Sequence, residues 1–283
     1  MGIESFPDYL EAKRAADERA RDRRTFELFI ETINDSVAPR VLDAGTGTGA
    51  MARRLLAALP DSDCQVIGVD TSAEGIEVAS AAGRVYAAER LQFEQVSLFS
   101  PEAKNTLQPL AAITAHSFVD EFPPDLFLHT CAQLLEGEGL VYTSLTYNGR
   151  TEFWPESSDT PYERRLLELY DRSMDERKFQ GQATGGSRGA SRLLAAAERH
   201  GFSIVCFGGS DWCIQPWRNE YMDGDHRLLE GMVDFVANEA NTHQEMNESR
   251  TEAWREERKA QIREKRLRLM VHHLDSLLRT PAR

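Results

Sequence analysis

Three glycines at alternate positions are the residues whose spacing most clearly indicates chemistry. The sequence of residues 40–52, RVLDAGTGTGAMA, predicts a short buried strand, a glycine-rich turn and a helix from about Ala50 to Leu59. Because Gly45, Gly47 and Gly49 have no Cβ atom, a ligand can lie against the backbone of this turn. The helix that follows offers unpaired N–H groups and a positive dipole end to a carboxylate or a phosphate.

Two acidic residues accompany the turn. Asp43 lies two residues before the first glycine, and Asp70 ends a second predicted strand, 65–69, just before Thr71. A carboxylate in the second position can accept hydrogen bonds from both hydroxyls of a ribose. The spacing Gly-x-Gly-x-Gly also differs from the Gly-x-Gly-x-x-Gly of dinucleotide-binding domains.

Together these features resemble motif I and the following acidic motif of the class I S-adenosylmethionine (SAM)-dependent methyltransferases. The resemblance covers residues 40–145 and implies SAM as cofactor, with S-adenosylhomocysteine as product. Ser97 stands where this family often has an acid that contacts the adenine amino group, and Leu98 could pack on the ring. The predicted cofactor-binding residues are Asp43, Gly45, Thr46, Gly47, Gly49, Asp70, Thr71, Ser97, Leu98 and His116. A turn that binds no cofactor and a nicotinamide-dependent oxidoreductase are the alternatives.

Residues 116–120 follow the fourth predicted strand, and in the family this segment lines the pocket beside the transferring methyl group. A general base is needed only when the acceptor must lose a proton. His116 is the candidate base because of its position and the pKa range of histidine, and a histidine that only shapes the pocket is the alternative. Asp120 could hold a cationic acceptor. The Asp/Asn-Pro-Pro-Tyr motif of nucleic-acid amino-methyltransferases is absent, which argues against base modification.

The elements that must position these residues alternate between strand and helix, which predicts an α/β fold with a doubly wound, mostly parallel sheet. The predicted strands are 41–42, 64–69, 91–96, 110–115, 140–146 and 202–207, and the predicted helices between and after them are 50–59, 72–88, 124–135, 161–176, 188–200, 224–240 and 245–265. Residues 267–278 fit either a helix or a strand. The resemblance implies a seven-stranded sheet, so we expect residues 268–274 to form its antiparallel strand.

Both ends of the chain and one internal segment fall outside the alternation. We expect an N-terminal helical lid (1–38) and a methyltransferase domain (39–283) with a helical C-terminal extension (218–283). The aromatic, irregular segment 147–187 predicts a cap over the substrate, and a packed insertion without function is the alternative. The charges of residues 13–24 indicate a solvated helix face. The resemblance implies instead that Tyr9, Lys13, Arg14 and Asp17 contact the substrate.

The remaining substrate candidates come from the predicted rim of the site. They are Tyr147, Asn148, Trp154, Tyr170, Arg177, Trp212 and His272. His272 and His273 are adjacent, so only one of them could face the site from a strand. A structural histidine, and an ordinary surface charge at Arg177, Arg172 and Asp175, are the alternatives.

Composition limits the partners of the chain. A net charge of −13 over 283 residues repels nucleic acid over most of the surface. Because no apolar run reaches membrane-span length and the N-terminus is charged, we expect a cytoplasmic protein. The four cysteines have no metal-binding spacing, which predicts buried reduced thiols and no metal site.

The predicted function is methyl transfer to a small molecule by in-line displacement. A protein or tRNA acceptor, with arginines of the terminal helices as docking site, and a scaffold without turnover are the alternatives. The charged terminal helices could also mediate a homodimer.

Overall fold

Short apolar runs bounded by turn residues form the strands of one large sheet. The computed structural model describes residues 6–243 and 245–281, so residues 1–5 of the predicted lid and residues 244 and 282–283 of the predicted C-terminal extension lie outside the described residues. The strands of the main sheet are β1 (Arg40–Ala44), β2 (Gln65–Asp70), β3 (Leu91–Gln95), β4 (Leu110–His116), β5 (Leu135–Trp154), β8 (Ser203–Gly209), β9 (Trp212–Ile214) and β10 (Arg268–Arg279). The short strands β6 (Lys178–Phe179) and β7 (Gln182–Ala183) form a separate hairpin.

The strand order is β3-β2-β1-β4-β5-β10-β8, and β9 pairs with β10 beside this path. The strands from β3 to β5 are parallel, whereas β10 runs antiparallel to β5, β8 and β9. This confirms the predicted doubly wound, mostly parallel class, and β10 is the antiparallel strand expected at 268–274. The described sheet has eight strands rather than seven because β9 adds a partner for the first part of β10.

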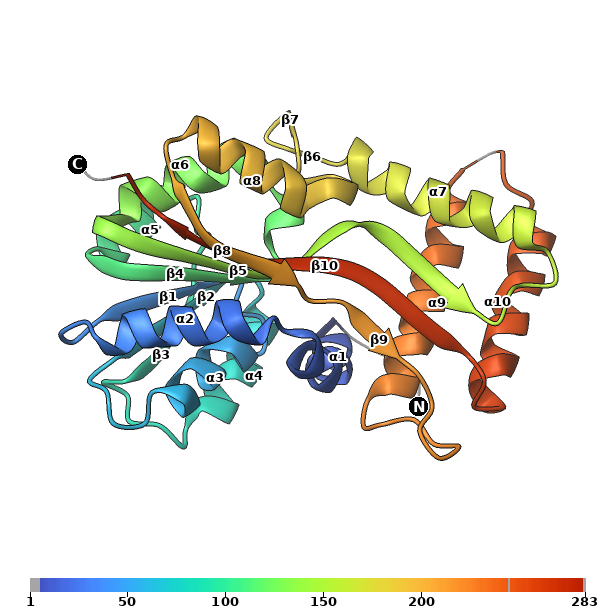
Figure 1. The fold of residues 1–283 in the computed structure, drawn as a ribbon, viewed down its shortest axis with the longest axis horizontal. Coiled ribbons are helices and arrows are strands. Elements are labelled where there is room, and N and C mark those ends of the chain that lie inside the picture. The colour runs from blue at the N-terminus through green and yellow to red at the C-terminus, as the bar shows by residue number, and fades with distance from the viewer. Residues whose placement is uncertain (1–5, 244, 282–283) are drawn as a thin grey trace.

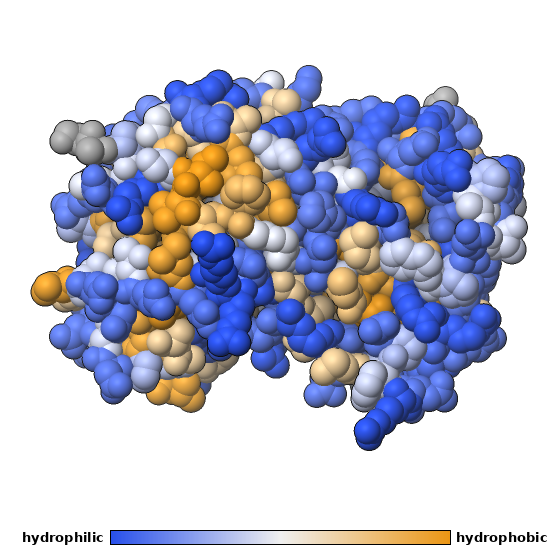
Figure 2. All heavy atoms as spheres, viewed as in Figure 1, coloured by the Kyte–Doolittle hydropathy of each residue, from blue (hydrophilic) through white to orange (hydrophobic). Residues whose placement is uncertain are grey.

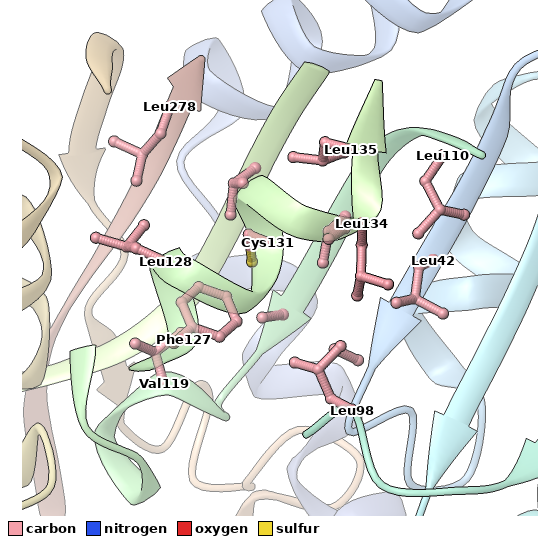
Figure 3. Packing of buried hydrophobic residues seen from close by; sticks show 14 of the residues in the cluster. Leu42, Leu98, Leu110, Val119, Phe127, Leu128, Cys131, Leu134, Leu135 and Leu278 are labelled. Atoms are coloured by element: carbon pink, nitrogen blue, oxygen red, sulfur yellow. The ribbon is translucent and has the colours of Figure 1, made fainter. Parts of the chain in front are cut away.

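Helices cover both faces of the sheet (Figure 1). One face packs against α2 (Arg23–Asn34), α3 (Ala50–Ala58) and α4 (Ala73–Gly83), and the other against α5 (Pro101–Leu107), α6 (Pro124–Leu134) and α8 (Gly189–Arg199). Figure 3 shows the second core, which includes Phe127, Leu128 and Cys131 of α6 together with Leu42, Leu98 and Leu278. Ser72 caps α4 as predicted, by accepting a hydrogen bond from the Gly75 amide. The helix ends at Gly83 rather than Ala88, and α5 was not predicted.

The remaining helices surround the halves of β5 and β10 that project beyond the rest of the sheet (Figure 1). They are α1 (Phe6–Ala20), α7 (Thr160–Glu176), α9 (Asp225–Asn241) and α10 (Glu248–Arg263), and with β9 they enclose a third hydrophobic core. Within this region, called the cap below, the fully buried Arg258 guanidinium bonds to Glu163 of α7. Two short 3₁₀ helices, η1 (Val119–Glu121) and η2 (Gly186–Arg188), lie where the cap meets the sheet.

The course of β5 differs from the prediction. The strand was expected to end at Thr146, but it continues to Trp154 and pairs there with Arg268 of β10. Asn148 and Gly149 lie in a bulge of β5, opposite the register shift between Val271 and His273, and Gly149 has φ +80°. Phe153, which follows this bulge, is buried, and its apolar contacts stabilise the second part of the strand.

The surface is mostly hydrophilic, in keeping with the acidic composition (Figure 2). Apolar atoms gather on this face where β8 forms the edge of the sheet, and Val205 and Phe207 of that strand are exposed. Cys64 and Cys131 are buried free thiols, as predicted, whereas Cys213 is exposed. None of the helices in the described part of the chain is long and apolar enough to span a membrane.

Candidate active site

A cavity of about 960 Å³ lies at the carboxyl ends of β1, β2 and β4. Ligands of open α/β sheets bind at this edge, and the volume suits a cofactor together with a small partner. The cap lines the cavity with side chains from α1, α7 and α9. The predicted residues that line it are Tyr9, Lys13, Arg14, Asp17, Asp43, Gly45, Thr46, Gly47, Asp70, Thr71, Ser97, Leu98, His116, Asp120, Tyr147, Tyr170, Arg177 and Trp212.

The glycine turn has the backbone conformation that its sequence indicates. Gly45 and Gly47 have φ +66° and +51°, in the left-handed region that glycine tolerates best. A Cβ atom at Gly45 would lie 2.2 Å from Phe118, and one at Gly47 would lie 2.7 Å from Leu10 of α1. Gly49 is different, because it caps α3 and a Cβ there would meet Phe93 rather than the cavity. We therefore correct its predicted role from cofactor contact to packing.

Asp43 links the glycine turn to a neighbouring strand through hydrogen bonds. Its carboxylate accepts hydrogen bonds from Thr46 Oγ1 at 2.6 Å and from Thr114 Oγ1 at 2.9 Å, which ties the turn to β4. Burial raises the pKa of Asp43 to about 6, although both threonine hydroxyls oppose that shift. The carboxylate thus shapes the turn, with both oxygens already engaged by protein groups.

Asp70 lies at the opposite side of the turn. One oxygen accepts a hydrogen bond from the Gly47 amide and the other from the Ser72 amide, both at 2.9 Å. Each carboxylate oxygen has a second lone pair, and Asp70 lines the cavity. The geometry therefore leaves acceptor capacity for two hydroxyl groups of a ribose.

The wall after β3 is apolar. Leu98 is buried at the cavity surface beside Ser97, whose hydroxyl accepts a weak hydrogen bond from the Phe99 amide at 3.3 Å. Phe99 and Phe118 stack with ring centroids 6.4 Å apart. An apolar wall of this kind can pack against an aromatic base. The glycine turn, the acceptor oxygens of Asp70 and this wall together fit SAM.

His116 has both ring nitrogens engaged. Nε2 lies 3.0 Å from Asp17 Oδ2 of α1, and Nδ1 lies 2.7 Å from Ser144 Oγ of β5. Burial and the nearby Lys13 charge lower the pKa of His116, while Asp17 partly opposes them. In the neutral ring, Nε2 donates to the carboxylate and Nδ1 accepts from the serine hydroxyl. This arrangement favours the alternative in which the histidine shapes the pocket.

Asp17 is the centre of this polar cluster. Besides His116, its carboxylate accepts hydrogen bonds from Lys13 Nζ at 2.8 Å and from Trp212 Nε1 at 2.9 Å. Lys13 Nζ also donates to Ser117 Oγ at 3.1 Å. Burial would raise the pKa of Asp17, but Lys13 and His116 hold it well below its usual range. Lys13 and Asp17 are buried, so they do not belong to a solvated helix face.

Asp120 lies on η1, directly after the fourth strand. Burial, followed by the charge of Glu121, raises the pKa of Asp120 to about 7. Arg177, predicted as a substrate contact, instead bonds to Glu121 at 2.6 Å at the same cavity wall. A carboxyl group with this pKa can hold a cation or exchange a proton near neutral pH.

Aromatic side chains form the half of the cavity beneath the cap. Tyr9, Tyr170 and Trp212 line it, as does Tyr147, whose hydroxyl donates to Asp171 at 2.6 Å. Phe235 of α9 also lines the cavity and packs edge-on against Tyr9 with ring centroids 5.0 Å apart.

Three substrate candidates lie elsewhere among the described residues. Asn148 accepts hydrogen bonds from Ser191 at the start of α8, and Trp154 is exposed at the far end of β5. His272 pairs with Asp211 at 2.7 Å and does not line the cavity. His273 lines it instead, because it lies on the same face of β10 as Leu269 and Val271, as strand alternation gives.

His273 and the α9 residues that line the cavity, such as Phe235, were not among the predicted site residues. His273 is buried, its Nδ1 has no hydrogen-bond partner among the described residues, and burial lowers its pKa to about 3. Its ring packs against Trp212 at 4.9 Å between centroids. The adjacent pair of histidines signalled one inward ring, and alternation from the buried Leu269 and Val271 selects His273.

Comparison with known proteins agrees with this geometry. Residues 41–139 match the family model of a methyltransferase domain. The chain is 39% identical over 105 residues to release factor glutamine methyltransferase of Vibrio cholerae, which covers 36% of each protein. The corresponding enzyme of Aliivibrio fischeri is 33% identical over 78 residues, or 26% of this chain and 27% of that enzyme. The chain thus matches about a third or less of the length of these relatives.

Solved structures resemble the whole fold at low sequence identity. The YcgJ protein of Bacillus subtilis superposes with a TM-score of 0.53 at 17% identity, covering 93% of this chain and all (100%) of that one. A Bacillus halodurans protein assigned as a methyltransferase gives a TM-score of 0.53 at 16% identity, covering 90% and 98%. These likenesses concern the fold, and the sequence match lies over the glycine turn and Asp70. Residues 41–139 therefore form a methyltransferase domain, and they lie within a doubly wound, mostly parallel sheet.

Proposed function

We propose that this protein transfers a methyl group from SAM to a small-molecule acceptor bound beneath the cap. The observation that carries the proposal is the single cavity, which joins the glycine turn and Asp70 to the aromatic half lined by Tyr9, Tyr170 and Trp212. SAM supplies a methyl group on a sulfonium, which is a good leaving group. The protein's main task is then to align the acceptor with that methyl group.

The residues divide this task between them. The turn from Gly45 to Gly47 offers its backbone to the methionine part of SAM, and Asp70 offers its oxygens to the ribose hydroxyls. Ser97 and Leu98 form the wall for the adenine. Lys13, Asp17 and His116 hold α1 over the site, which excludes water from the acceptor.

A protein acceptor is the second candidate, because the curated relatives are named as release factor glutamine methyltransferases. Their similarity to this chain is limited to about a third of their length. A small acceptor is favoured because side chains of α1, α7 and α9 line the cavity and narrow the space beside the cofactor. A cytoplasmic location and a homodimer remain predictions.

Two measurements test the proposal. Calorimetric titration with SAM, S-adenosylhomocysteine and NAD(H) should show binding of the first two only, and exclusive NAD(H) binding would overturn the assignment. The protein is then incubated with methyl-labelled SAM and a cell extract that is separated by size afterwards. We expect label in the small-molecule fraction, whereas label confined to protein or RNA would refute a small acceptor.

A further inference from the structure

Within residues 6–243 and 245–281, every cation that lines the cavity pairs with a carboxylate, but not every carboxylate pairs with a cation. Lys13 pairs with Asp17 at 2.8 Å, and Arg177 pairs with Glu121 at 2.6 Å. Arg14 lies 3.3 Å from Glu11 of the same helix. Each cation that lines the cavity therefore has a carboxylate partner in the described structure.

Asp120 has no such counterpart. No side chain among the described residues forms a hydrogen bond or an ion pair with its carboxylate, although the residue is half-buried at the cavity wall. Its backbone is held closely on the other side, because a Cβ atom at Gly189 would lie 2.8 Å from Asp120 Cβ and one at Gly185 would lie 3.0 Å from its Cα. The two glycines thus fix an unpaired carboxylate in position at the cavity.

Aromatic groups lie near this carboxylate. Burial raises the pKa of Tyr9 and of Tyr170, and the charge of Asp120 raises both further, so the three side chains share one region of the cavity. Aromatic rings attract a cation through their electron-rich faces, most strongly where water is excluded. An unpaired carboxylate with tyrosine rings beside it is a suitable environment for an ammonium group.

We propose that the methyl acceptor is an organic amine, whose ammonium group binds to Asp120 between Tyr9 and Tyr170. This inference rests on the proposed function, because it names the acceptor of the same site. Before methyl transfer, an N–H bond of the ammonium breaks, its proton moves to the Asp120 carboxylate, and the electron pair remains on nitrogen. Asp120 returns the proton to solvent when the product leaves.

The surroundings of Asp120 give this step a defined pH dependence. Burial and Glu121 raise its pKa to about 7, while Arg177 and Lys13 act in the opposite direction. The pKa values of Tyr9 and Tyr170 are raised and those of His116 and His273 are lowered, so all four are shifted away from the range in which Asp120 ionises. Because an amine stays protonated in this range, its binding should strengthen about tenfold from pH 6 to 8 as Asp120 ionises.

The experiment compares ligands that differ only in their polar group. Calorimetry at pH 8 with saturating S-adenosylhomocysteine measures 2-phenylethylamine, 2-phenylethanol and 3-phenylpropanoate, and then hexylamine, hexanol and hexanoate. We expect an amine to bind at least tenfold more tightly than its alcohol and its acid. The variant Asp120→Asn should lose this preference, whereas Asp125→Asn, the same change in an acid on the surface of α6, should keep it.

Several results would overturn the inference. They are an acid or alcohol as the tightest ligand, no binding of any amine at millimolar concentration, or an unchanged amine preference in Asp120→Asn. If Asp120→Asn does not fold, the pH profile of the native protein decides, and amine affinity that is flat from pH 6 to 8 refutes the role of Asp120. Failure of S-adenosylhomocysteine to bind would instead refute the proposed function, so the two failures are distinguishable.

Discussion

Removal of the Asp17 carboxylate should detach α1 from the rest of the site. In Asp17→Ala, Lys13 Nζ, His116 Nε2 and Trp212 Nε1 all lose the oxygen to which they are bonded at 2.8–3.0 Å. The most costly consequence is the Lys13 ammonium, whose residue is only 4% exposed and which keeps a single bond to Ser117. A buried charge without its counter-charge is strongly destabilising.

The magnitude follows from that burial. Removing one partner of a buried ion pair costs about 3–5 kcal/mol, far more than the loss of a surface pair. For a chain of this size the midpoint of thermal unfolding should fall on the order of 10 °C. Lys13→Met should cost less, because Asp17 keeps two donors and the charge that lowers the pKa of His116 is gone. The pKa of His116 should therefore rise in Lys13→Met and fall in Asp17→Ala.

The assays are urea unfolding, hydrogen exchange of α1 amides and NMR titration of the His116 ring. Glu18→Ala is the matched control, because Glu18 is the next residue of α1 and its side chain, which is 45% exposed, pairs with Arg21 and Arg54. It should change the free energy of unfolding by less than about 1 kcal/mol. A loss in Asp17→Ala no larger than in this control, with unchanged exchange of α1, would refute the reasoning.

Three further changes test other parts of the site. Asp70→Ala should weaken binding of S-adenosylhomocysteine by about 1.5–3 kcal/mol in calorimetry, since hydrogen bonds to a charged acceptor are lost; unchanged affinity would mean that the ribose lies elsewhere. The folded pKa of Asp43, about 6, exceeds its unfolded value of about 4, so its contribution to stability is full below pH 4 and is lost as pH rises through 6. Asp43→Asn should therefore gain up to about 3 kcal/mol relative to the native protein between pH 4 and 7 in urea unfolding, and a constant difference would contradict this. His273→Phe should leave the unfolding midpoint unchanged or raised while it alters acceptor binding, because it removes an unpaired buried nitrogen; His272→Ala, in a partly exposed pair with Asp211, should leave acceptor binding unchanged.

Local sequence signals predicted the turn and the acid that line one half of the cavity. The glycine spacing and Asp70 lie within one strand–turn–helix unit and the end of the next strand, so their arrangement depends on short-range backbone geometry. The parallel strands were also predictable, since each is a short apolar run between turn residues. Gly49 shows the limit of this reasoning, because its contact with Phe93 of β3 depends on packing between elements.

The acceptor half depends on contacts between residues far apart in the chain. Alternation along β10 from the buried Leu269 and Val271 selects His273, but this choice required knowing that residues 267–278 form a strand rather than a helix. Trp154 was placed near the site because β5 was expected to end at Thr146, whereas the strand carries it to the far end of the cap. The burial of Lys13 and Asp17 required knowing that His116 and Trp212 lie beside α1.

One helix closes both halves of the cavity, and this links the two ligands. Leu10 of α1 packs over Gly47, and Glu11 accepts a hydrogen bond from Thr48 at 2.9 Å, so the helix contacts the cofactor turn directly. One turn further along, Lys13 and Asp17 fix the same helix above His116. Any ligand that favours the closed position of α1 therefore helps to build the pocket for the other ligand. Since such coupling is reciprocal, cofactor and acceptor should each strengthen the binding of the other. Asp17 connects α1 to the acceptor half, because it bonds to His116 and Trp212.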